Sequence, residues 1–463
     1  MSDEGKLTPR PRGALWFEQA LLPTGWASAV RLTLADGRIA AVEADVALRP
    51  DDAAGGVALP GLGDLHSHAF QRGMAGLAET RGPAGDDFWT WREVMYRFLE
   101  RLTPEAVEAI AALAYVEMLE TGFTRVGEFH YLHHGPGGRA YDDPAEMAAR
   151  IAAAAAQTGV GLTLLPVFYA HSGFGGADPT AGQRRFVNDI DGFARLLGAS
   201  RAALAGLEDA VVGLAPHSLR AVTPAELTAL EPLAEGGPIH IHIAEQAREV
   251  EDCLAWSGRR PVEWLLDNAP VDARWCLIHA THMTAAETLA LARSGAVAGL
   301  CPITEANLGD GLFPAAEYWA AAGAFGVGSD SNVLIDAAEE LRTLEYGQRL
   351  SRRGRNLLAR DQGGSTGADL YRGALAGGAQ ALGGVAGGLS VGASADIVGL
   401  RADHPSLAGR TSDALIDSLV FAAGRGAVDG VWRAGRKLVS DGRHHQRSAI
   451  EARYRRVLEG LLA

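Results

Sequence analysis

The stretch that decides the fold is Gly61-Leu62-Gly63-Asp64-Leu65-His66-Ser67-His68, a short apolar run that ends in two histidines. If this run is a β-strand that passes into a loop, alternation places both imidazoles on the same side, about 7 Å apart along the chain. Two histidines so placed can chelate a metal ion, whereas the same pair in an ordinary polar loop would be solvated. A metal site therefore needs further ligands from elsewhere in the chain.

Working outward, the sequence alternates short apolar runs with helical segments. The predicted strands span residues 59–66, 124–129, 161–168, 211–215, 238–243, 275–279, 296–301 and 324–329. Helix N-caps are expected between them at Thr103, Asp143, Thr223 and Thr284. Eight such βα units predict an α/β fold, a (β/α)8 TIM-like barrel. A doubly wound sheet is the alternative, but no GxGxxG motif follows the first strand.

Both ends of the chain have a different pattern. Residues 14–46 contain short apolar alternations around Asp36-Gly37, a strong hairpin signal, and residues 388–398 and 428–439 also look like strands. The polar, Gly- and Ala-rich residues 51–56 are interpreted as a linker. We therefore predict a small β-sandwich domain built from both chain ends. The predicted division is residues 1–57 and 386–445 for this domain, 58–385 for the catalytic barrel, and 446–463 for a C-terminal helix.

Composition limits the kinds of partner. The chain has 463 residues, a formal net charge of −14 and 48% hydrophobic residues, without a lysine- or arginine-rich block or an apolar run of membrane-spanning length. These features predict a small-molecule ligand rather than nucleic acid or a membrane. The N-terminal twelve residues lack the apolar core of a secretion signal, so a cytoplasmic protein is expected.

Only two lysines occur, Lys6 and Lys437, and both lie far from the middle of the chain. A Schiff-base lysine, a phosphate-binding lysine or a carbamylated lysine bridging two metals is therefore not expected in the barrel. The three cysteines, Cys253, Cys276 and Cys301, form no CxxC pair and are predicted to be reduced thiols.

In barrels of this class the active site lies at the C-terminal ends of the strands. The polar residues expected there are His66, His68, His130, Tyr131, His171, His217, Arg220, His242, Glu245, His279 and Asp330. From this set, His66, His68, His242 and Asp330 form a nitrogen and oxygen ligand set suited to one Zn²⁺ per subunit, with Fe²⁺ as the alternative. Such an ion would lower the pKa of water and generate hydroxide at neutral pH.

Two neighbours of this ligand set are assigned to catalysis with Asp330. Glu245 follows His242 by three residues and is predicted to shuttle a proton, and His279 to orient the water or polarise the substrate. The structural alternative is favoured for His240, which is expected to be a hydrogen-bonded core residue one layer below His242. The histidines placed in polar loops and expected to face solvent are His133, His134, His404, His444 and His445.

These motifs resemble a known family. His66-Ser67-His68, His242-Ile243-Ala244-Glu245, His279-Ala280-Thr281-His282 and Gly328-Ser329-Asp330 are similar to the metal and catalytic motifs of the amidohydrolase superfamily, in its mononuclear branch of cytosine-deaminase-like and chlorohydrolase-like enzymes. The missing barrel lysine agrees with that branch. The longer stretches 66–72, 88–93, 128–131, 217–222 and 304–311 resemble the formimidoylglutamate deiminases of histidine degradation.

The resemblance implies hydrolysis of N-formimino-L-glutamate to N-formyl-L-glutamate and ammonia by a homodimer. A small-molecule dicarboxylate of this kind calls for arginines, whose planar fork binds carboxylates bidentately. Arg220 and Arg92 are the candidates, and Arg92 acts either within its own chain or from the neighbouring subunit. Gln71, Tyr131 and His217 are expected to bind the rest of the glutamyl group. The alternatives are a deaminase of a purine, pyrimidine or triazine ring, and a barrel that binds without catalysis.

Overall fold

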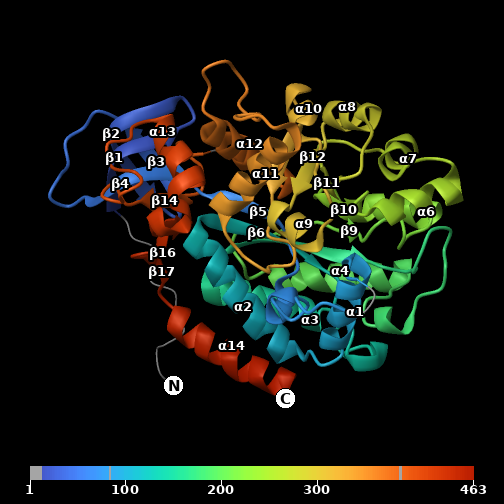
Figure 1. Cartoon of the computed structure of the whole chain (residues 1–463). Coiled ribbons are helices and arrows are strands. Elements are labelled where there is room, and N and C mark those ends of the chain that lie inside the picture. The colour runs from blue at the N-terminus through green and yellow to red at the C-terminus, as the bar shows by residue number, and fades with distance from the viewer. Residues whose placement is uncertain (1–12, 83–84, 385–387) are drawn as a thin grey trace, which may run out of the picture.

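The structure, a computed structural model, describes residues 13–82, 85–384 and 388–463 and consists of a large barrel beside a small β domain (Figure 1). Eight strand positions form the barrel wall: β5 (Leu62–Ser67), β6 (Phe123–His130), β7 (Gly161–Phe168), β8 (Val211–Val212) with β9 (Ala215–Pro216), β10 (Ile239–Ile243), β11 (Trp275–His279), β12 (Val297–Leu300) and β13 (Ala324–Val327). The predicted fourth strand is thus two short pieces, and the predicted first strand is divided, because β4 (Ala53–Pro60) ends before β5 begins.

The barrel closes through two seams between parallel arcs of strands. One arc runs β5-β6-β7-β8, with β9 also pairing β7, and the other runs β10-β11-β12-β13. Parallel bridges join Leu214 to Ile239 at one seam and Ser67 to Asp330 at the other. The predicted (β/α)8 barrel is therefore confirmed.

Helices connect the strands and surround the barrel. They are α1 (Phe88–Leu99), α2 (Pro104–Thr121), α3 (Glu146–Thr158), α4 (Ile190–Leu204), α5 (Pro224–Leu230), α6 (Ala247–Ser257), α7 (Pro261–Asn268), α8 (Ala285–Ser294), α9 (Pro302–Leu308), α10 (Ala315–Ala320), α11 (Ala337–Arg352) and α12 (Thr366–Ala381). The hydroxyls of Thr103, Thr223 and Thr284 accept backbone N–H groups at the starts of α2, α5 and α8, so these predicted N-caps are confirmed. The predicted N-cap at Asp143 is wrong: the Asp143 carboxylate accepts the N–H of Ala145 at 2.8 Å in the preceding turn, and α3 begins only at Glu146.

Strands from both chain ends form one β domain, which lies to the left of the barrel in Figure 1. Its eight strands follow the order β17-β16-β15-β14-β4-β1-β2-β3. Apart from β4, they are β1 (Gly13–Leu22), β2 (Gly25–Ala35), β3 (Arg38–Glu43), β14 (Ile397–Leu400), β15 (Val428–Arg433), β16 (Arg436–Ser440) and β17 (Arg443–His444). The predicted hairpin turn at Asp36-Gly37 joins β2 to β3, and both turn residues have positive φ.

This sheet curls over its own core. The rings of Phe17 on β1 and Trp432 on β15 lie 6.0 Å apart, although β4 and β14 stand between their strands. In a flat sheet three strand spacings would separate them by about 14 Å. The curled sheet encloses a separate apolar cluster that includes Val30, Leu32 and Ile397. The helix α13 (Asp413–Ser418) and the terminal helix α14 (Arg447–Leu462) complete the C-terminal part.

The interpretation of residues 51–56 as a linker is wrong. Residues from Ala53 onward belong to β4, which pairs with β1 on one side and β14 on the other and crosses the predicted domain boundary at residue 57. Their small size reflects close packing rather than a flexible connection. A Cβ atom on Gly55 would lie 2.7 Å from the Phe17 ring, and one on Gly56 would lie 2.7 Å from Ala402.

The lower end of the barrel is sealed by the end of α12. His240 Nε2 donates to the carbonyl of Ala381 at 2.8 Å, and Thr163 Oγ1 donates to that of Leu382 at 2.9 Å. His240 is fully buried, so the prediction of a hydrogen-bonded core histidine is confirmed. Because this end is closed, a ligand can approach the barrel interior only from the C-terminal ends of the strands.

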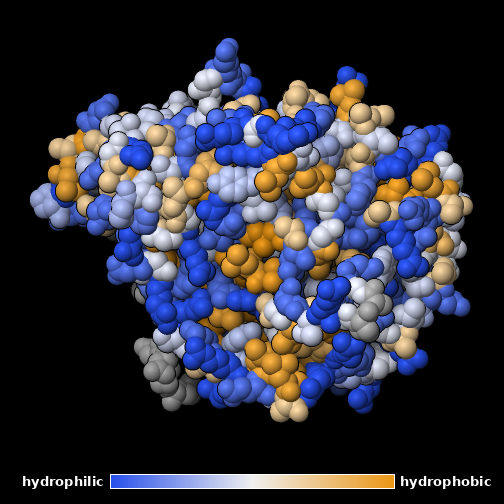
Figure 2. Space-filling view, viewed as in Figure 1, coloured by the Kyte–Doolittle hydropathy of each residue, from blue (hydrophilic) through white to orange (hydrophobic). Residues whose placement is uncertain are grey.

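Most side chains on the face seen in Figure 2 are hydrophilic, with apolar residues gathered near its middle and lower edge. Among the described residues, no helix combines the length and apolarity that crossing a bilayer requires.

Candidate active site

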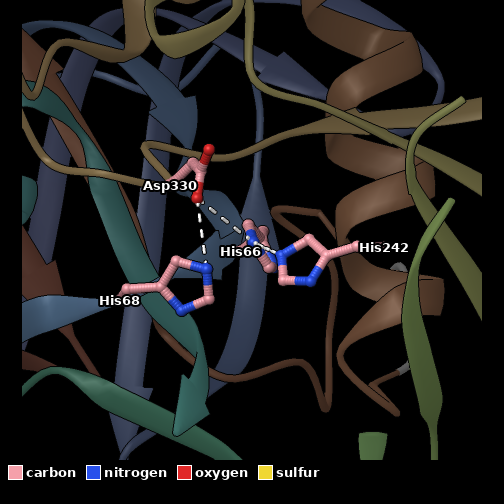
Figure 3. A group of neighbouring side chains, drawn as sticks. All are labelled: His66, His68, His242 and Asp330. Atoms are coloured by element: carbon pink, nitrogen blue, oxygen red, sulfur yellow. Dashed lines mark hydrogen bonds and ion pairs between the residues drawn. The ribbon is translucent and has the colours of Figure 1, made fainter. Parts of the chain in front are cut away.

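Four side chains meet at the C-terminal ends of the first, fifth and eighth strands. His66 lies on β5, His68 just beyond it, His242 on β10, and Asp330 in the turn after β13, and all four point toward one another in Figure 3. Their ligand atoms all lie within 4.8 Å of one another. The structure therefore brings together the four residues predicted as metal ligands.

The hydrogen bonds of these imidazoles leave lone pairs facing the centre of the group. His68 Nδ1 donates to the carbonyl of Phe129 at 2.8 Å, and His242 Nδ1 donates to that of His217 at 3.0 Å, so both Nε2 atoms are unprotonated when the rings are neutral. His242 Nε2 lies 3.0 Å from His66 Nε2. Converging lone pairs repel one another unless a cation lies among them.

The spacing of the ligand atoms fits such a cation. Asp330 Oδ1 lies 3.3 Å from the Nε2 atoms of both His66 and His68. Ligands 2.0–2.1 Å from a tetrahedral zinc ion lie about 3.3–3.4 Å apart. Burial lowers the pKa of His68 to about 3 and that of His242 well below its ordinary value, which keeps both rings neutral and able to coordinate. The donor set therefore fits a divalent metal ion.

The backbone holds these ligands in register across the seam. His68 N donates to the carbonyl of Asp330 at 2.9 Å, and Asp330 N donates to that of His66 at 2.9 Å. A Cβ atom on Gly328 would lie 2.7 Å from the His66 backbone, so only glycine permits this close approach. Ala244, His279 and Asp330 all have φ between +45° and +68°, which is uncommon for residues with a Cβ and concentrates strain at the strand ends.

A buried carboxylate below the ligands ties the two strands further. Asp64 Oδ2 accepts the hydroxyl of Ser329 at 2.6 Å, and its Oδ1 accepts the Ser329 N–H at 3.0 Å. Asn332 in turn donates to Ser67 Oγ at 3.1 Å. Although sequence reasoning gave Asp64 no role, its i, i+2 spacing with His66 and His68 was a signal that it shares their face.

Glu245 and His279 lie beside the four ligands. His279 Nε2 is 3.9 Å from Glu245 Oε1 and 3.8 Å from Asp330 Oδ2, while its Nδ1 faces Glu305 Oε1 at 3.3 Å. Glu305 thus orients the ring so that Nε2 points toward the ligands. Glu305 belongs to the stretch 304–311, but its position in the sequence does not predict this role.

The two groups shift each other's protonation. Burial raises the pKa of Glu245 to about 7, which is the range in which a carboxyl group can both accept and return a proton near neutrality. Burial alone would lower the pKa of His279, but the carboxylates of Glu245, Glu305 and Asp330 outweigh it and raise that pKa to about 10.

A cavity opens above these groups and encloses about 580 Å³, with the solvent at its mouth included. Its wall contains ten of the predicted site residues, namely His68, Gln71, Arg92, Tyr131, His217, Arg220, His242, Glu245, His279 and Asp330. Gln71 Nε2 donates to Tyr131 Oη at 2.8 Å, whereas its Oε1 is buried without a hydrogen-bond partner among the described residues. That oxygen is available to accept a hydrogen bond from a ligand.

Two arginines, Arg92 and Arg220, also line the cavity. The Arg92 guanidinium stacks 4.4 Å from the centre of the Trp89 ring, and that of Arg220 lies 5.8 Å from the same ring. Arg92 lines the cavity of its own chain. The nearest carboxylate recorded for Arg220 is Glu249 at 4.0 Å, so the guanidinium is accompanied by a negative charge but not saturated by it.

Other histidines near the strand ends do not reach the cavity wall. His130 is buried against His133, with ring centroids 5.8 Å apart, and His171 pairs with Glu226 at 3.0 Å. The prediction that His133 and His444 face solvent is wrong. Both side chains are buried, and a backbone carbonyl satisfies each ring. His133 Nε2 donates to the carbonyl of Val167 at 2.8 Å, and His444 Nε2 donates to that of Thr158 at 3.0 Å. His445 is exposed, and His134 and His404 are half-buried.

Sequence reasoning missed most of the apolar lining. Phe88, Trp91, Met95 and Tyr96 enter the cavity wall from α1, and Tyr169, Phe186 and Leu308 complete it. The aromatic run at 88–91 indicates α1, but Tyr169 and Phe186 lie in the connection between β7 and α4, and Leu308 ends α9, so only the fold brings them together.

Comparison with known proteins places this site in a family. The sequence model of the Amidohydrolase family matches residues 57–438, and that of the formimidoylglutamate deiminase HutF N-terminal domain matches residues 14–56. A formimidoylglutamate deiminase from Pseudomonas aeruginosa is 54% identical over 442 residues, which cover 94% of this chain and 97% of that protein. A 5-methylthioadenosine/S-adenosylhomocysteine deaminase from Natronomonas pharaonis is 28% identical, with 84% and 83% covered.

Solved structures give the same result. The crystal structure of an amidohydrolase from Brucella melitensis superposes with a TM-score of 0.95 at 56% identity, covering 97% of this chain and 100% of that one. A zinc-bound adenosine deaminase from Xanthomonas campestris has a TM-score of 0.81 at 24% identity, with 98% and 100% covered, and shares the fold.

Proposed function

Because the chain belongs to the amidohydrolase family and, within it, to the formimidoylglutamate deiminases, we propose that it hydrolyses N-formimino-L-glutamate. The products are N-formyl-L-glutamate and ammonia, and the reaction is a step of histidine degradation. The observation that carries this proposal is a single cavity that is lined both by residues of the metal-ligand set and by two arginines. A substrate with an amidine-like carbon and two carboxylates has matching groups at its two ends.

The arginines are proposed to bind the carboxylates. Among the described residues, no carboxylate lies within 4.0 Å of the Arg92 guanidinium, and Arg220 keeps donors free beside Glu249. The Arg92 guanidinium lies 4.4 Å from the centre of the Trp89 ring, and this contact restricts its motion and lowers the entropy lost when a carboxylate binds. Gln71, Tyr131 and His217 line the same cavity and are proposed to hydrogen bond the glutamyl amine and its neighbouring polar atoms.

The chemistry is proposed to use Glu245, His279 and Asp330. A divalent ion held by the four ligands supplies hydroxide at neutral pH, because it lowers the pKa of water from 15.7 toward about 7. His279 and Asp330 orient the attacking oxygen toward the formimino carbon. Glu245 carries the two protons of the attacking water, one after the other, to the terminal nitrogen; the bond between this nitrogen and the formimino carbon then breaks, ammonia leaves, and the oxygen remains as the formyl C=O.

We propose Zn²⁺ as the resident ion, one per subunit, with Fe²⁺ as the alternative that the same donors accept. Metal analysis of protein purified without added metal distinguishes the two. We also propose that the protein is a cytoplasmic homodimer. Its cysteines are unpaired, which suits a reducing compartment, and light scattering should give twice the 48.5 kDa chain mass.

A deaminase of a purine, pyrimidine or triazine ring is the second candidate. The aromatic side chains Phe88, Trp91 and Tyr96 on the cavity wall favour it, because they could stack on a planar ring. The two arginines have no evident role with an uncharged ring.

The test is ammonia release by the metal-loaded protein from N-formimino-L-glutamate, compared with N-formimino-L-aspartate, guanine, cytosine and adenosine. Rapid release from the glutamate compound, with little from the rings, is expected. Turnover of a ring substrate without turnover of the glutamate compound would overturn the substrate assignment and leave the metal site in place.

A further inference from the structure

Glu249 is a fully buried carboxylate that contacts the backbone at Glu245 and also faces Arg220. It is the third residue of α6, the helix that follows β10 and its ligand His242. Its side chain does not line the cavity, so it cannot touch the substrate. A buried carboxylate is costly unless several donors compensate it, which raises the question of what this one holds.

The two carboxylate oxygens of Glu249 fix the backbone turn at Ala244 and Glu245. Its Oε1 accepts the N–H of Ala244 and its Oε2 accepts that of Glu245, both at 3.2 Å. Ala244 has φ of 50°, a left-handed conformation that costs free energy in a residue with a Cβ. Two successive amides held by one carboxylate favour this turn, which aims the side chain of Glu245 into the cavity.

The same carboxylate faces Arg220. The closest distance, 4.0 Å from Arg220 Nη2 to Glu249 Oε2, is too long for a hydrogen bond. Arg220 Nε has no hydrogen-bond partner among the described residues, and only 11% of the side chain is exposed. Glu249 thus balances the charge of the guanidinium without occupying its donors, which remain free for a ligand. A closer bidentate pair would saturate them.

From these contacts we infer that Glu249 is a positioning residue that sets the span between the proton-transferring Glu245 and the carboxylate-binding Arg220. This inference rests on the proposed function, which assigns those two roles. A fixed span between the reacting end and the carboxylate end would also select for substrate length. Glu249 therefore contributes to the preference for N-formimino-L-glutamate over its shorter aspartate analogue.

Two variants separate the contributions of the residue. Glu249→Gln keeps the length but loses the charge and one acceptor oxygen, whereas Glu249→Asp keeps the charge but shortens the reach. The matched control is Glu251→Gln, which removes the same charge from an exposed position of the same helix. Thermal unfolding and metal content are measured for every variant.

For Glu249→Gln we expect kcat/KM on N-formimino-L-glutamate to fall about 10- to 100-fold, as for other groups that orient a site from behind. The ratio of kcat/KM between the glutamate and aspartate compounds should also fall, while Glu251→Gln changes neither. The decisive measurement is a double-mutant cycle. The effect of Glu249→Gln on KM should disappear in an Arg220→Met background, and its effect on kcat should disappear in a Glu245→Gln background.

Equal effects of Glu249→Gln in all backgrounds, or an unchanged substrate ratio, would mean a merely structural residue and would overturn the inference. If Glu249→Gln does not fold, Glu249→Asp replaces it in the same cycle with the same criterion. Failure of the proposed function is distinguishable, because the unmodified protein itself would then not release ammonia from the glutamate compound.

Discussion

The two walls of the cavity are built differently. The metal-ligand wall consists of side chains at the ends of β5, β10 and β13, all buried and fixed by backbone hydrogen bonds across the barrel seams. The arginine wall consists of α1 and the segment around Arg220, where aromatic rings and half-buried cations face the opening. Under the proposed function, the reaction chemistry would rest on the barrel strands, and the choice of substrate on the segments added to them.

The arginine wall still has an internal support. Arg185 is almost fully buried, and its guanidinium donates to the carbonyls of Leu99, Leu102 and His134. These contacts cap the end of α1 and tie it to the loop after β6. The helix α1 is thus anchored at its C-terminal end by Arg185 and at its N-terminal end by the Asp87 cap.

The largest effect should follow from breaking the metal-ligand wall. Removing the metal with a chelator, or replacing Asp330 by Asn, should reduce ammonia release to background, because the lone pairs of the histidines lose their cation and the water its activation. Re-addition of Zn²⁺ should restore the chelated protein but not the variant. Full activity of demonstrably metal-free protein would contradict this prediction.

The next largest effect on activity is expected at Glu245, which lies beside the four ligands. Glu245→Gln should lower kcat by about 10²- to 10⁴-fold, because the amide cannot transfer a proton. Metal content should not change, since Glu245 is not among the four ligands. Activity near that of the unmodified protein would show that another group carries the proton.

Changes on the arginine wall should affect binding more than chemistry. Arg220→Met should cost about 1.5–3 kcal/mol, or ~10- to 150-fold in kcat/KM, because a charge-assisted hydrogen bond to a carboxylate is lost. Arg92→Met should act in the same direction, since Arg92 lines the same cavity. Kinetics with uncharged formimino compounds provide the control, and an equal loss on those would refute the carboxylate assignment.

The smallest effect on activity is expected at His444, which lies outside the cavity. Its expected effect is on the free energy of unfolding. Burial lowers its pKa to about 4, so the unfolded chain, whose histidine titrates near 6.5, binds more protons on acidification. Its contribution to the free energy of unfolding is present above pH 6.5 and is lost as the pH falls toward 4. Relative to His444→Gln, the unmodified protein should lose on the order of 1–2 kcal/mol between pH 8 and pH 5. Chemical denaturation at both pH values measures this, and parallel losses would refute it.

The sequence predicts the parts of the molecule that repeat or alternate. Strand periodicity and threonine caps locate the βα units, and the strand ends then indicate the residues that meet above the barrel. It fails where composition and packing give opposite signals. Ala53–Gly56 looks like a linker but is β4, because small residues are needed beside Phe17. His133 looks solvated, but a carbonyl distant in sequence satisfies its ring.

The residues that support the site could not be predicted from the sequence for a related reason. Glu249 and Glu305 act through backbone amides or through another side chain, and nothing in local spacing distinguishes them from surface glutamates. Their burial depends on strands that are far apart in the sequence. Predicting such residues requires the three-dimensional contacts themselves.

The seam between β5 and Asp330 has a consequence for folding. Two ligands come from the first strand of the barrel and one from the turn after the last, so the complete ligand sphere exists only once the ring of strands has closed. A nascent chain that lacks the final strand has the three histidine ligands but not Asp330, and its ring of strands is still open. Metal uptake then reports completion of the whole domain, and by mass action the ion shifts the closing equilibrium toward the native state.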